Sequence, residues 1–244
     1  TIKDRDIAYE ATLREEQEKM RIKRQLTNNI NHELKTPVAS IQVCLETLLS
    51  GINISEEKRQ ELIERCYANN ERLRRLLGDV SLITRMEDGS QLIGKESVVI
   101  NNIINEIAEE LEIMPEEERF LLHTNFNEQV IVDGNLSLIA SIFRNLTENA
   151  IAYSGGKNIY ISLIENNDNY CRIDFEDDGC GVEEKQLPRL FERFYRVDKG
   201  RSRQMGGTGL GLAIVKHAVQ FHGGTITVTN SQSGGLRFEF TLKK

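Results

Sequence analysis

The segment INHELKTPVASIQVCLETL, residues 30–48, decides the fold of the first part of the chain. Its apolar residues recur at intervals of three and four, which places them along one side of an α-helix. They are Ile30, Leu34, Val38, Ile41, Leu45 and Leu48. The alternation slips once, beside Pro37. A more interrupted version of the pattern runs back to Ile2, so we expect a coiled-coil-like helix that ends at Gly51.

A second helix with the same pattern is expected after a short loop. Ser55 is a suitable N-cap, Glu56 and Glu57 occupy the first turn, and Asp88-Gly89 ends the helix. Its seam consists of Leu62, Cys66, Asn69, Leu73, Leu76, Val80 and Ile83. A hairpin with one apolar stripe per helix buries little surface, and a second copy would complete a dimeric four-helix bundle. A coiled-coil dimerisation module without chemistry fits this half of the chain about as well.

Beyond Lys95, segments with the residue spacing of strands alternate with segments that have the spacing of helices. The pattern predicts strands at 98–100, 120–122, 130–132, 159–164, 171–175, 225–229 and 236–242, and helices at 101–111, 136–153 and 208–221. Strands with helices on one face indicate an α+β sandwich rather than a doubly wound sheet. We therefore divide the chain into an all-α hairpin domain at 1–88, a linker at 89–97 and a second domain at 98–244.

The composition of the chain argues against several classes of function. The 244 residues carry a formal net charge of −7, which argues against a nucleic-acid or anionic-membrane partner. The four cysteines and four histidines are dispersed, so a disulfide scaffold and a zinc site are both poor interpretations. No apolar run reaches the roughly 18 residues that span a bilayer. The chain begins at Thr1 rather than Met, and we expect it to be a fragment of a longer protein.

One candidate site lies in the first helix, at Asn31–Pro37. With Leu34 in the seam, His32 takes an outward position, which suits a nucleophile that two different proteins must reach, although it also suits an ordinary surface histidine. Glu33 beside it is placed to accept a proton from one ring nitrogen. Thr36 lies one helical turn from His32 on the same face, and the alternative is that it caps or stabilises the turn before Pro37.

A second candidate site is formed by two asparagines. Asn145 and Asn149 are four residues apart, so their amide oxygens leave one helix face together. Amide oxygens are ligands for a Mg²⁺ ion that also binds phosphate oxygens. Two exposed asparagines with no function are the alternative.

Two glycine-rich segments complete the set of motifs. Asp177–Gly181 follows an apolar strand, where Asp177 is placed to accept hydrogen bonds from an exocyclic amine. Gly206–Leu212 runs into a helix N-terminus, which favours phosphate. Plain turns are the alternative for both. Between them, Lys199–Gln204 is typical of either a basic lid over phosphates or a surface loop. A GxxxxGK[ST] loop is missing, which excludes a P-loop NTPase.

Taken in order, these motifs closely resemble those of the histidine kinases of two-component signalling. Asn31–Pro37 resembles the H box, Asn145–Asn149 the N box, Asp177–Gly181 the first glycine box, Phe191–Arg196 the F box and Gly207–Leu212 the second glycine box. The resemblance implies a phosphotransfer hairpin followed by an ATP-binding domain of the GHKL type. It also implies ATP and Mg²⁺ as cofactors, a homodimer, a response regulator as partner, and a sensor upstream that holds the full-length protein in the bacterial cytoplasmic membrane.

The resemblance also implies roles for single residues. His32 corresponds to the phosphoacceptor, Glu33 to its acid–base partner, and Thr36 to a residue that assists dephosphorylation of the regulator. The implied nucleotide-site residues are Asn145 and Asn149 for Mg²⁺, Tyr153 and Asp177 for adenine, Gly179 and Gly181 in the first glycine box, Arg196 for the terminal phosphates, and Gly207, Thr208, Gly209, Leu210 and Gly211 in the lid hinge.

Two departures and two rival functions accompany the resemblance. Ala152 stands where many relatives have Lys, and Asn135 where an Asp is common. A GHKL ATPase would need a Glu at the position of Asn145 to activate water, and Glu148 lies about 100° around the helix from Asn149. A catalytically silent scaffold is the other rival, and Ala152 is its only support.

Overall fold

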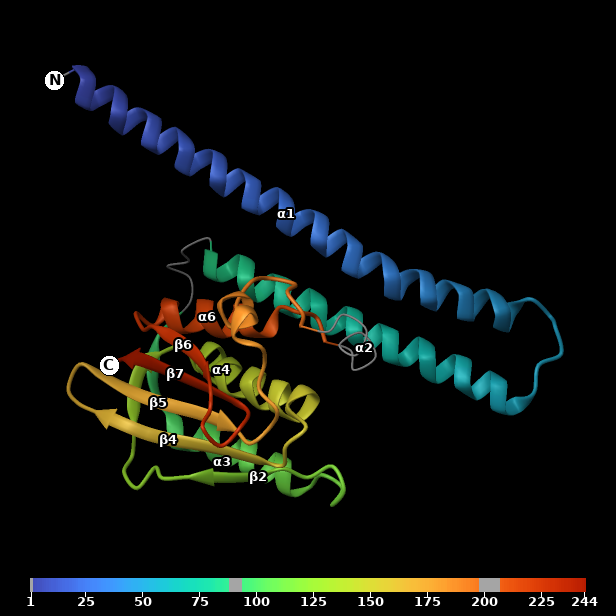
Figure 1. Cartoon of the computed structure of the whole chain (residues 1–244). Helices are drawn as coiled ribbons and strands as arrows, with labels where there is room; N and C mark the ends of the chain where they lie inside the picture. The colour runs from blue at the N-terminus through green and yellow to red at the C-terminus, as the bar shows by residue number, and fades with distance from the viewer. Residues whose placement is uncertain (1, 88–93, 198–206) are drawn as a thin grey trace. The chain divides into compact units, whose positions relative to one another are not determined.

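Two long helices joined by a short loop begin the chain (Figure 1). The computed structural model describes residues 2–87, 94–197 and 207–244. Helix α1 spans Ile2–Leu49 and helix α2 spans Glu56–Glu87. The chain divides into two compact units, Thr1–Leu77 and Gly78–Lys244, so α2 begins in the first unit and ends in the second. The prediction of two long helices is confirmed.

The ends of these helices follow from local chemistry. The amide of Lys58 donates to the Ser55 hydroxyl at 3.2 Å, which is the N-cap bond predicted for α2. Helix α1 ends two residues before Gly51 and continues through Pro37. The predicted stop at Asp88-Gly89 lies outside the described residues.

The apolar residues of the hairpin divide into two sets. Pro37, Cys44, Leu62 and Leu76 are buried. A second set stays exposed although it belongs to the same apolar stripes or flanks them: Val38, Val43, Leu45, Leu49, Ile63, Tyr67 and Leu77. The seam predicted from the sequence is therefore only partly covered within one chain, which leaves an apolar surface for a further partner.

The second unit is built on a five-stranded sheet of order β2-β4-β5-β7-β6, with a separate two-stranded sheet formed by β1 and β3. The strands are β1 (Glu96–Val99), β2 (Leu121–Thr124), β3 (Ile131–Gly134), β4 (Asn158–Asn166), β5 (Tyr170–Asp177), β6 (Ile226–Asn230) and β7 (Leu236–Lys243). Only the β2–β4 pair is parallel among the described strands of the larger sheet. The predicted closing hairpin of β6 and β7 is confirmed.

Three helices cover one face of this sheet (Figure 1). They are α3 (Ile100–Glu112), α4 (Leu136–Asn149) and α6 (Gly211–Phe221), and two short turns are η1 (Ala150–Ser154) and η2 (Glu184–Arg189). The core forms where the helices meet β5 and β7. Phe143 of α4 meets Phe240 of β7 edge to face, with ring centroids 5.7 Å apart, and both side chains are fully buried. The arrangement is the predicted α+β sandwich.

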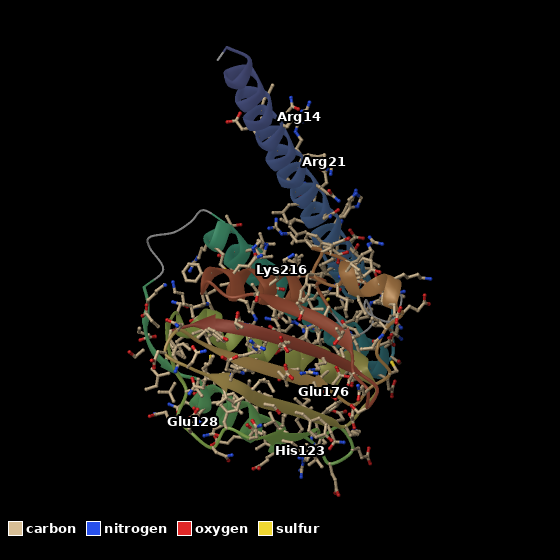
Figure 2. All side chains as sticks on the ribbon, turned by 60° about the vertical axis from the view of Figure 1, so that its left-hand side comes forward. Arg14, Arg21, His123, Glu128, Glu176 and Lys216 are labelled. Carbon is tan, nitrogen blue, oxygen red and sulfur yellow. The ribbon has the colours of Figure 1, made fainter. Side chains whose placement is uncertain are left out.

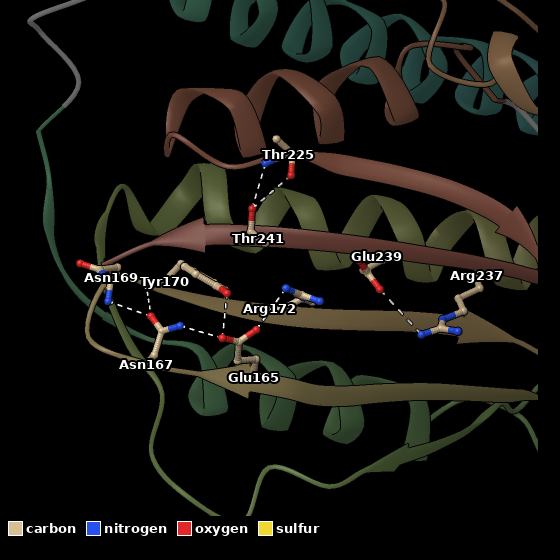
Figure 3. A network of polar contacts seen from close by, with 9 residues as sticks. All are labelled: Glu165, Asn167, Asn169, Tyr170, Arg172, Thr225, Arg237, Glu239 and Thr241. Carbon is tan, nitrogen blue, oxygen red and sulfur yellow. Dashed lines mark hydrogen bonds and ion pairs between the residues drawn. The ribbon is translucent and has the colours of Figure 1, made fainter.

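The other face of the sheet is polar. His123 and Glu176 lie on it (Figure 2), and His123 stacks on Tyr160 with ring centroids 4.8 Å apart. Figure 3 shows part of its network, in which Arg172 pairs with Glu165 at 3.1 Å. Because apolar side chains of the same strands face the helices, the alternation along each strand fixes which face receives the helices.

Most of the predicted boundaries shift by one or two residues, and three of the differences have a clear structural cause. Ile100 begins α3 instead of ending a strand, because its fully buried side chain belongs to the helix stripe. Helix α4 gives way at Ala150 to the π-helical turn η1, which is capped by Gly155 in the left-handed conformation. Helix α6 begins at Gly211 and not at Thr208. None of the described helices is long and apolar enough to cross a membrane.

Candidate functional site

Helix α4 brings the two asparagines to the N-terminus of α6. Asn135 caps α4, since its side-chain oxygen accepts from the amide of Leu138 at 3.0 Å. Further along, the Asn145 amide nitrogen donates to the carbonyl of Ser141 at 2.7 Å, which fixes the orientation of the side chain. A Cβ at Gly211 would lie 2.6 Å from Asn145 Oδ1 and 3.7 Å from Asn149 Nδ2. Asn145 and Asn149 therefore border the backbone at the start of α6, where phosphate binding is favoured.

The first glycine box meets the π-helical turn at the end of α4. The amide of Cys180 donates to the carbonyl of Ser154 at 3.0 Å. A Cβ at Gly179 would lie 2.4 Å from that same carbonyl oxygen, so only glycine fits there. Tyr153, expected near adenine, is half-buried in the turn beside Ser154. The predicted first glycine box therefore lies against the turn that follows the predicted N box.

Asp177 ends β5 as a buried carboxylate, with 4% of its surface exposed. The amide of Gly179 donates to its Oδ1 at 3.0 Å. Burial raises the pKa of Asp177, and the amides of Gly179 and Leu236 oppose that rise. The carboxylate is thus held in one orientation by backbone amides, in a place where an amine that donates a hydrogen bond would stabilise its charged form.

Asp178, the next residue, has a structural role that the sequence did not indicate. Its Oδ1 accepts from the amides of Lys157 and Asn158, each at 2.8 Å, and its Oδ2 accepts from the Asn158 side chain at 2.7 Å. Burial acts to raise the pKa of Asp178, but the hydrogen bonds from Asn158 and Lys157 outweigh it and lower the pKa. Asp178 therefore ties the loop to the start of β4.

The F box and the second glycine box are also joined. Arg196 Nη2 donates to the carbonyl of Gly207 at 2.7 Å, and the amide of Phe194 donates to the carbonyl of Gly209 at 2.7 Å. Phe194 has a φ of 62°, a costly conformation for a side chain of its size. The hydrogen bond to Gly209 holds Phe194 in this conformation.

Thr208 and Leu210 lie in the stretch that leads to α6. The Thr208 hydroxyl donates to Asp79 Oδ2 at 2.7 Å and accepts from the amide of Leu210 at 3.2 Å. Leu210 itself is fully buried and anchors the stretch in the core. The basic residues of the predicted lid, Lys199–Gln204, lie outside the described residues.

In the hairpin unit, His32 and Glu33 are adjacent in the H box but point to different sides of helix α1. His32 is exposed, as its predicted outward position requires. Glu33 instead faces α2, where its carboxylate accepts from Arg72 Nη2 at 2.8 Å, and the two side chains are only 18% and 11% exposed. Thr36 is exposed as well, and its hydroxyl donates to the carbonyl of His32 at 3.4 Å. Arg72 is a site residue that no motif in the sequence identified.

Family models match both units in the expected order. The His Kinase A (phospho-acceptor) domain matches residues 22–89, and the histidine kinase-, DNA gyrase B- and HSP90-like ATPase matches residues 134–244. The chain is 33% identical over 221 residues to the sensor-like histidine kinase SenX3 of Mycolicibacterium smegmatis, a match that covers 90% of this chain. The chain belongs to the sensor histidine kinase family.

Further comparisons agree with this family. The sensor protein kinase WalK of Staphylococcus aureus is 32% identical over 230 residues, or 93% of this chain. These matches span 57% of SenX3 and 55% of WalK, so this histidine kinase chain corresponds to a little over half the length of each relative. The crystal structure of histidine kinase ThkA in complex with the response regulator TrrA shares the fold, with a TM-score of 0.70 at 22% identity over 93% of this chain and 64% of that one.

Proposed function

We propose that this chain is an ATP-dependent protein-histidine kinase that phosphorylates His32 and passes the phosphoryl group to an aspartate of a response regulator. The observation that carries the proposal is the convergence in the second unit of the paired asparagines of α4 with the glycine-rich N-terminus of α6, in a chain whose first unit presents an exposed H-box histidine.

The nucleotide site fits ATP with Mg²⁺ in its donor set. Asn145 and Asn149 offer neutral oxygens to a Mg²⁺ ion that shares phosphate oxygens, and the start of α6 at Gly211 offers backbone amides. Asp177 offers a buried acceptor for the adenine amine. The close contacts at Gly179 and Gly211 hold the glycine segments against Ser154 and Asn145, which keeps the proposed donors together. Arg196 is placed in this proposal at the terminal phosphates, and Tyr153 beside the adenine.

ATP supplies the γ-phosphoryl group, and the chain supplies the acceptor. A ring nitrogen of exposed His32 would attack phosphorus as ADP leaves. For Glu33 to take up the proton on the other ring nitrogen, its carboxylate must leave Arg72 and turn toward His32. In the structure Arg72 holds the Glu33 carboxylate on the inter-helix side, so breaking this ion pair is part of the proposed step. A Mg²⁺ ion held by Asn145 and Asn149 would, together with the backbone amides at the start of α6, stabilise the charge that develops on the phosphate oxygens.

The exposed apolar residues of the hairpin support a homodimer. Val38, Leu45 and Leu49 of α1 and Ile63 and Tyr67 of α2 are too apolar to remain in water on a bundle of two helices. A second hairpin would cover them in a four-helix bundle. The response regulator is proposed as the other partner, by analogy with the ThkA complex. Attachment to the cytoplasmic membrane through a sensor segment stays a prediction.

The two rival functions make different predictions from the same site. A GHKL ATPase needs a general base at the position of Asn145, whose amide here is committed to the Ser141 carbonyl. Incubation with γ-³²P-ATP separates the three. Acid-labile, base-stable label on the chain that disappears in His32→Gln, with ATP binding retained, supports the kinase. Free phosphate without label supports an ATPase, and neither product supports a silent scaffold.

We further propose that the chain dephosphorylates its phospho-regulator with the help of Thr36. Its exposed hydroxyl lies one turn from His32, where a docked receiver would present its phospho-aspartate. The hydroxyl would orient water and is not consumed. Its 3.4 Å bond to the His32 carbonyl is long and easily given up. Thr36→Ala should keep labelling of His32 while slowing loss of phosphate from purified phospho-regulator. Equal clearance by both proteins would exclude the role.

A further inference from the structure

The turn between β6 and β7 packs against the backbone of the proposed adenine-binding segment, Asp177–Gly181. A Cβ at Gly235 would lie 2.0 Å from the Asp177 carbonyl oxygen and 2.5 Å from its Oδ1. A Cβ at Gly234 would lie 2.8 Å from the Gly179 carbonyl oxygen. Gly235 also has a φ of 67°, which other residues rarely adopt. The turn is thus shaped to the backbone of the segment that it supports.

Side chains of the turn hold the strand that leads into this segment. The hydroxyls of Ser231 and Ser233 both donate to Glu176 Oε1, and they are within hydrogen-bond distance of each other at 2.8 Å. Glu176 is the residue before Asp177, on the polar face of the sheet (Figure 2). The turn therefore contacts the strand end from the side opposite the helices, next to the buried carboxylate.

Asn230, the last residue of β6, binds the far end of the segment. Its Oδ1 accepts from the amide of Val182 at 3.0 Å, and its Nδ2 donates to the carbonyl of the same residue at 2.8 Å. A Cβ at Gly181 would lie 2.6 Å from Asn230 Oδ1. A single side-chain amide thus satisfies both polar groups of one loop residue, just after the last glycine of the motif.

We propose that Asn230 is a positioning residue for nucleotide recognition. Its two hydrogen bonds to Val182, called the clamp below, hold Gly181 and the loop that follows Asp177 in one conformation. The inference rests on the proposed function, because it assigns Asn230 to the base-recognising part of that site. Without the clamp, the loop samples more conformations, and the nucleotide must order it on binding. Loss of the two hydrogen bonds should weaken ATP binding about three- to tenfold.

A matched control exists elsewhere in the same unit. Asn101 makes the same two-point contact with backbone, since its Oδ1 accepts from the amide of Val130 at 2.9 Å and its Nδ2 donates to the carbonyl of Glu128 at 3.0 Å. It belongs to α3, and both of these hydrogen bonds go to residues outside the proposed site. Asn101→Ala therefore removes equivalent hydrogen bonds without touching the loop.

The experiment measures Kd for Mg-ATP and for inorganic tripolyphosphate, and KM and kcat for autophosphorylation, in the parent, Asn230→Ala, Asn230→Asp and Asn101→Ala. We expect Asn230→Ala to raise Kd and KM for ATP three- to tenfold, with kcat and tripolyphosphate affinity unchanged. Asn230→Asp, which replaces the donor with an acceptor facing the Val182 carbonyl, should raise them at least as much and serves if the alanine variant does not fold. Asn101→Ala should leave all four values unchanged.

Three kinds of outcome would overturn the inference. Parent-like ATP values in the Asn230 variants would show that the clamp does not position the site. An equal loss of ATP and tripolyphosphate affinity would show a general structural effect, as would equal losses in the Asn230 and Asn101 variants. A parent protein that does not bind Mg-ATP would overturn the proposed function together with this inference, and so differs from the other two.

Discussion

Replacement of Gly211 by alanine tests whether Asn145 and the start of α6 form one metal and phosphate site. The added methyl group would lie 2.6 Å from Asn145 Oδ1, inside the 3.4 Å of ordinary contact. Gly211 is already helical, so alanine brings no backbone strain of its own. The perturbation is therefore a steric displacement of one amide oxygen by about 0.8 Å.

The magnitude follows from how Asn145 is held. Its amide nitrogen donates to the Ser141 carbonyl at 2.7 Å, and the displaced side chain must stretch or lose that bond, at a cost of about 0.5–1.5 kcal/mol. Such a cost corresponds to a two- to tenfold loss in Mg-ATP affinity. The rate of phosphoryl transfer should fall further, about ten- to a hundredfold, because a displacement of roughly 1 Å disturbs the alignment of the reacting groups.

Two measurements on the 244-residue chain check this expectation. Titration with Mg-ATP followed by calorimetry gives the affinity, and labelling of the chain by γ-³²P-ATP gives the rate. Gly78→Ala is the control for binding. Gly78 lies in helix α2 with no atom within 4 Å of an added Cβ, so alanine should leave affinity unchanged and stabilise the helix by about 0.5–1 kcal/mol.

A double-mutant cycle decides whether Asn145 is the cause. In an Asn145→Ala background the clash is absent, so Gly211→Ala should cost nothing further in Mg-ATP affinity. An unchanged affinity and rate in the single Gly211→Ala variant would refute the geometry of the site. A full additional loss in the Asn145→Ala background would mean that the methyl group acts on something other than that side chain.

Three further predictions concern the metal, the glycine loop and pH. Asn149→Ala should reduce Mg²⁺-dependent ATP binding and stop labelling, as shown by the same titration with and without Mg²⁺. Asp178→Ala removes three hydrogen bonds to a carboxylate and should lower the free energy of unfolding, measured in urea at pH 7, by about 2 kcal/mol. Since the pKa of Asp178 is lowered in the folded protein, the difference in unfolding free energy between parent and variant should shrink as pH falls below 3.8. Burial lowers the pKa of His222, whose Nε2 accepts from the Asn135 amide at 3.0 Å. The free energy of unfolding should therefore decrease as pH falls below 6.5. In urea titrations, His222→Gln should make this pH dependence weaker.

The sequence predicts the elements well where one period runs undisturbed. The hairpin helices and the closing strands of the sheet follow from spacing alone, and the N-cap of α2 follows from Ser55. The boundary of α4 was missed because a helical stripe does not distinguish an α-turn from the π-turn that begins at Ala150. The start of α6 was placed three residues early because Thr208 and Leu210 extend an apolar and glycine-rich pattern without helical backbone.

Only the part of the candidate site that lies in short sequence motifs could be predicted from the sequence. Asn145, Asp177 and Gly211 stand in segments whose residue types carry the chemistry. The residues that support them are distant in sequence: Asn230 is 48 residues from Val182, and Arg72 is 39 residues from Glu33. Such pairs depend on strand and helix register, which no local pattern specifies.

The Glu33–Arg72 pair shows how a contact so far along the chain determines a chemical property of the H box. Successive residues of an α-helix are about 100° apart, so the adjacent His32 and Glu33 cannot both face α2. Arg72 binds Glu33 at 2.8 Å in a largely buried position, and Asn69 and Ser40 meet at 3.3 Å along the same seam. These contacts fix the rotation of α1 about its axis. Because Glu33 must then face inward, His32 must face outward, and the accessibility of the proposed phosphoacceptor is set by an ion pair in which it takes no part.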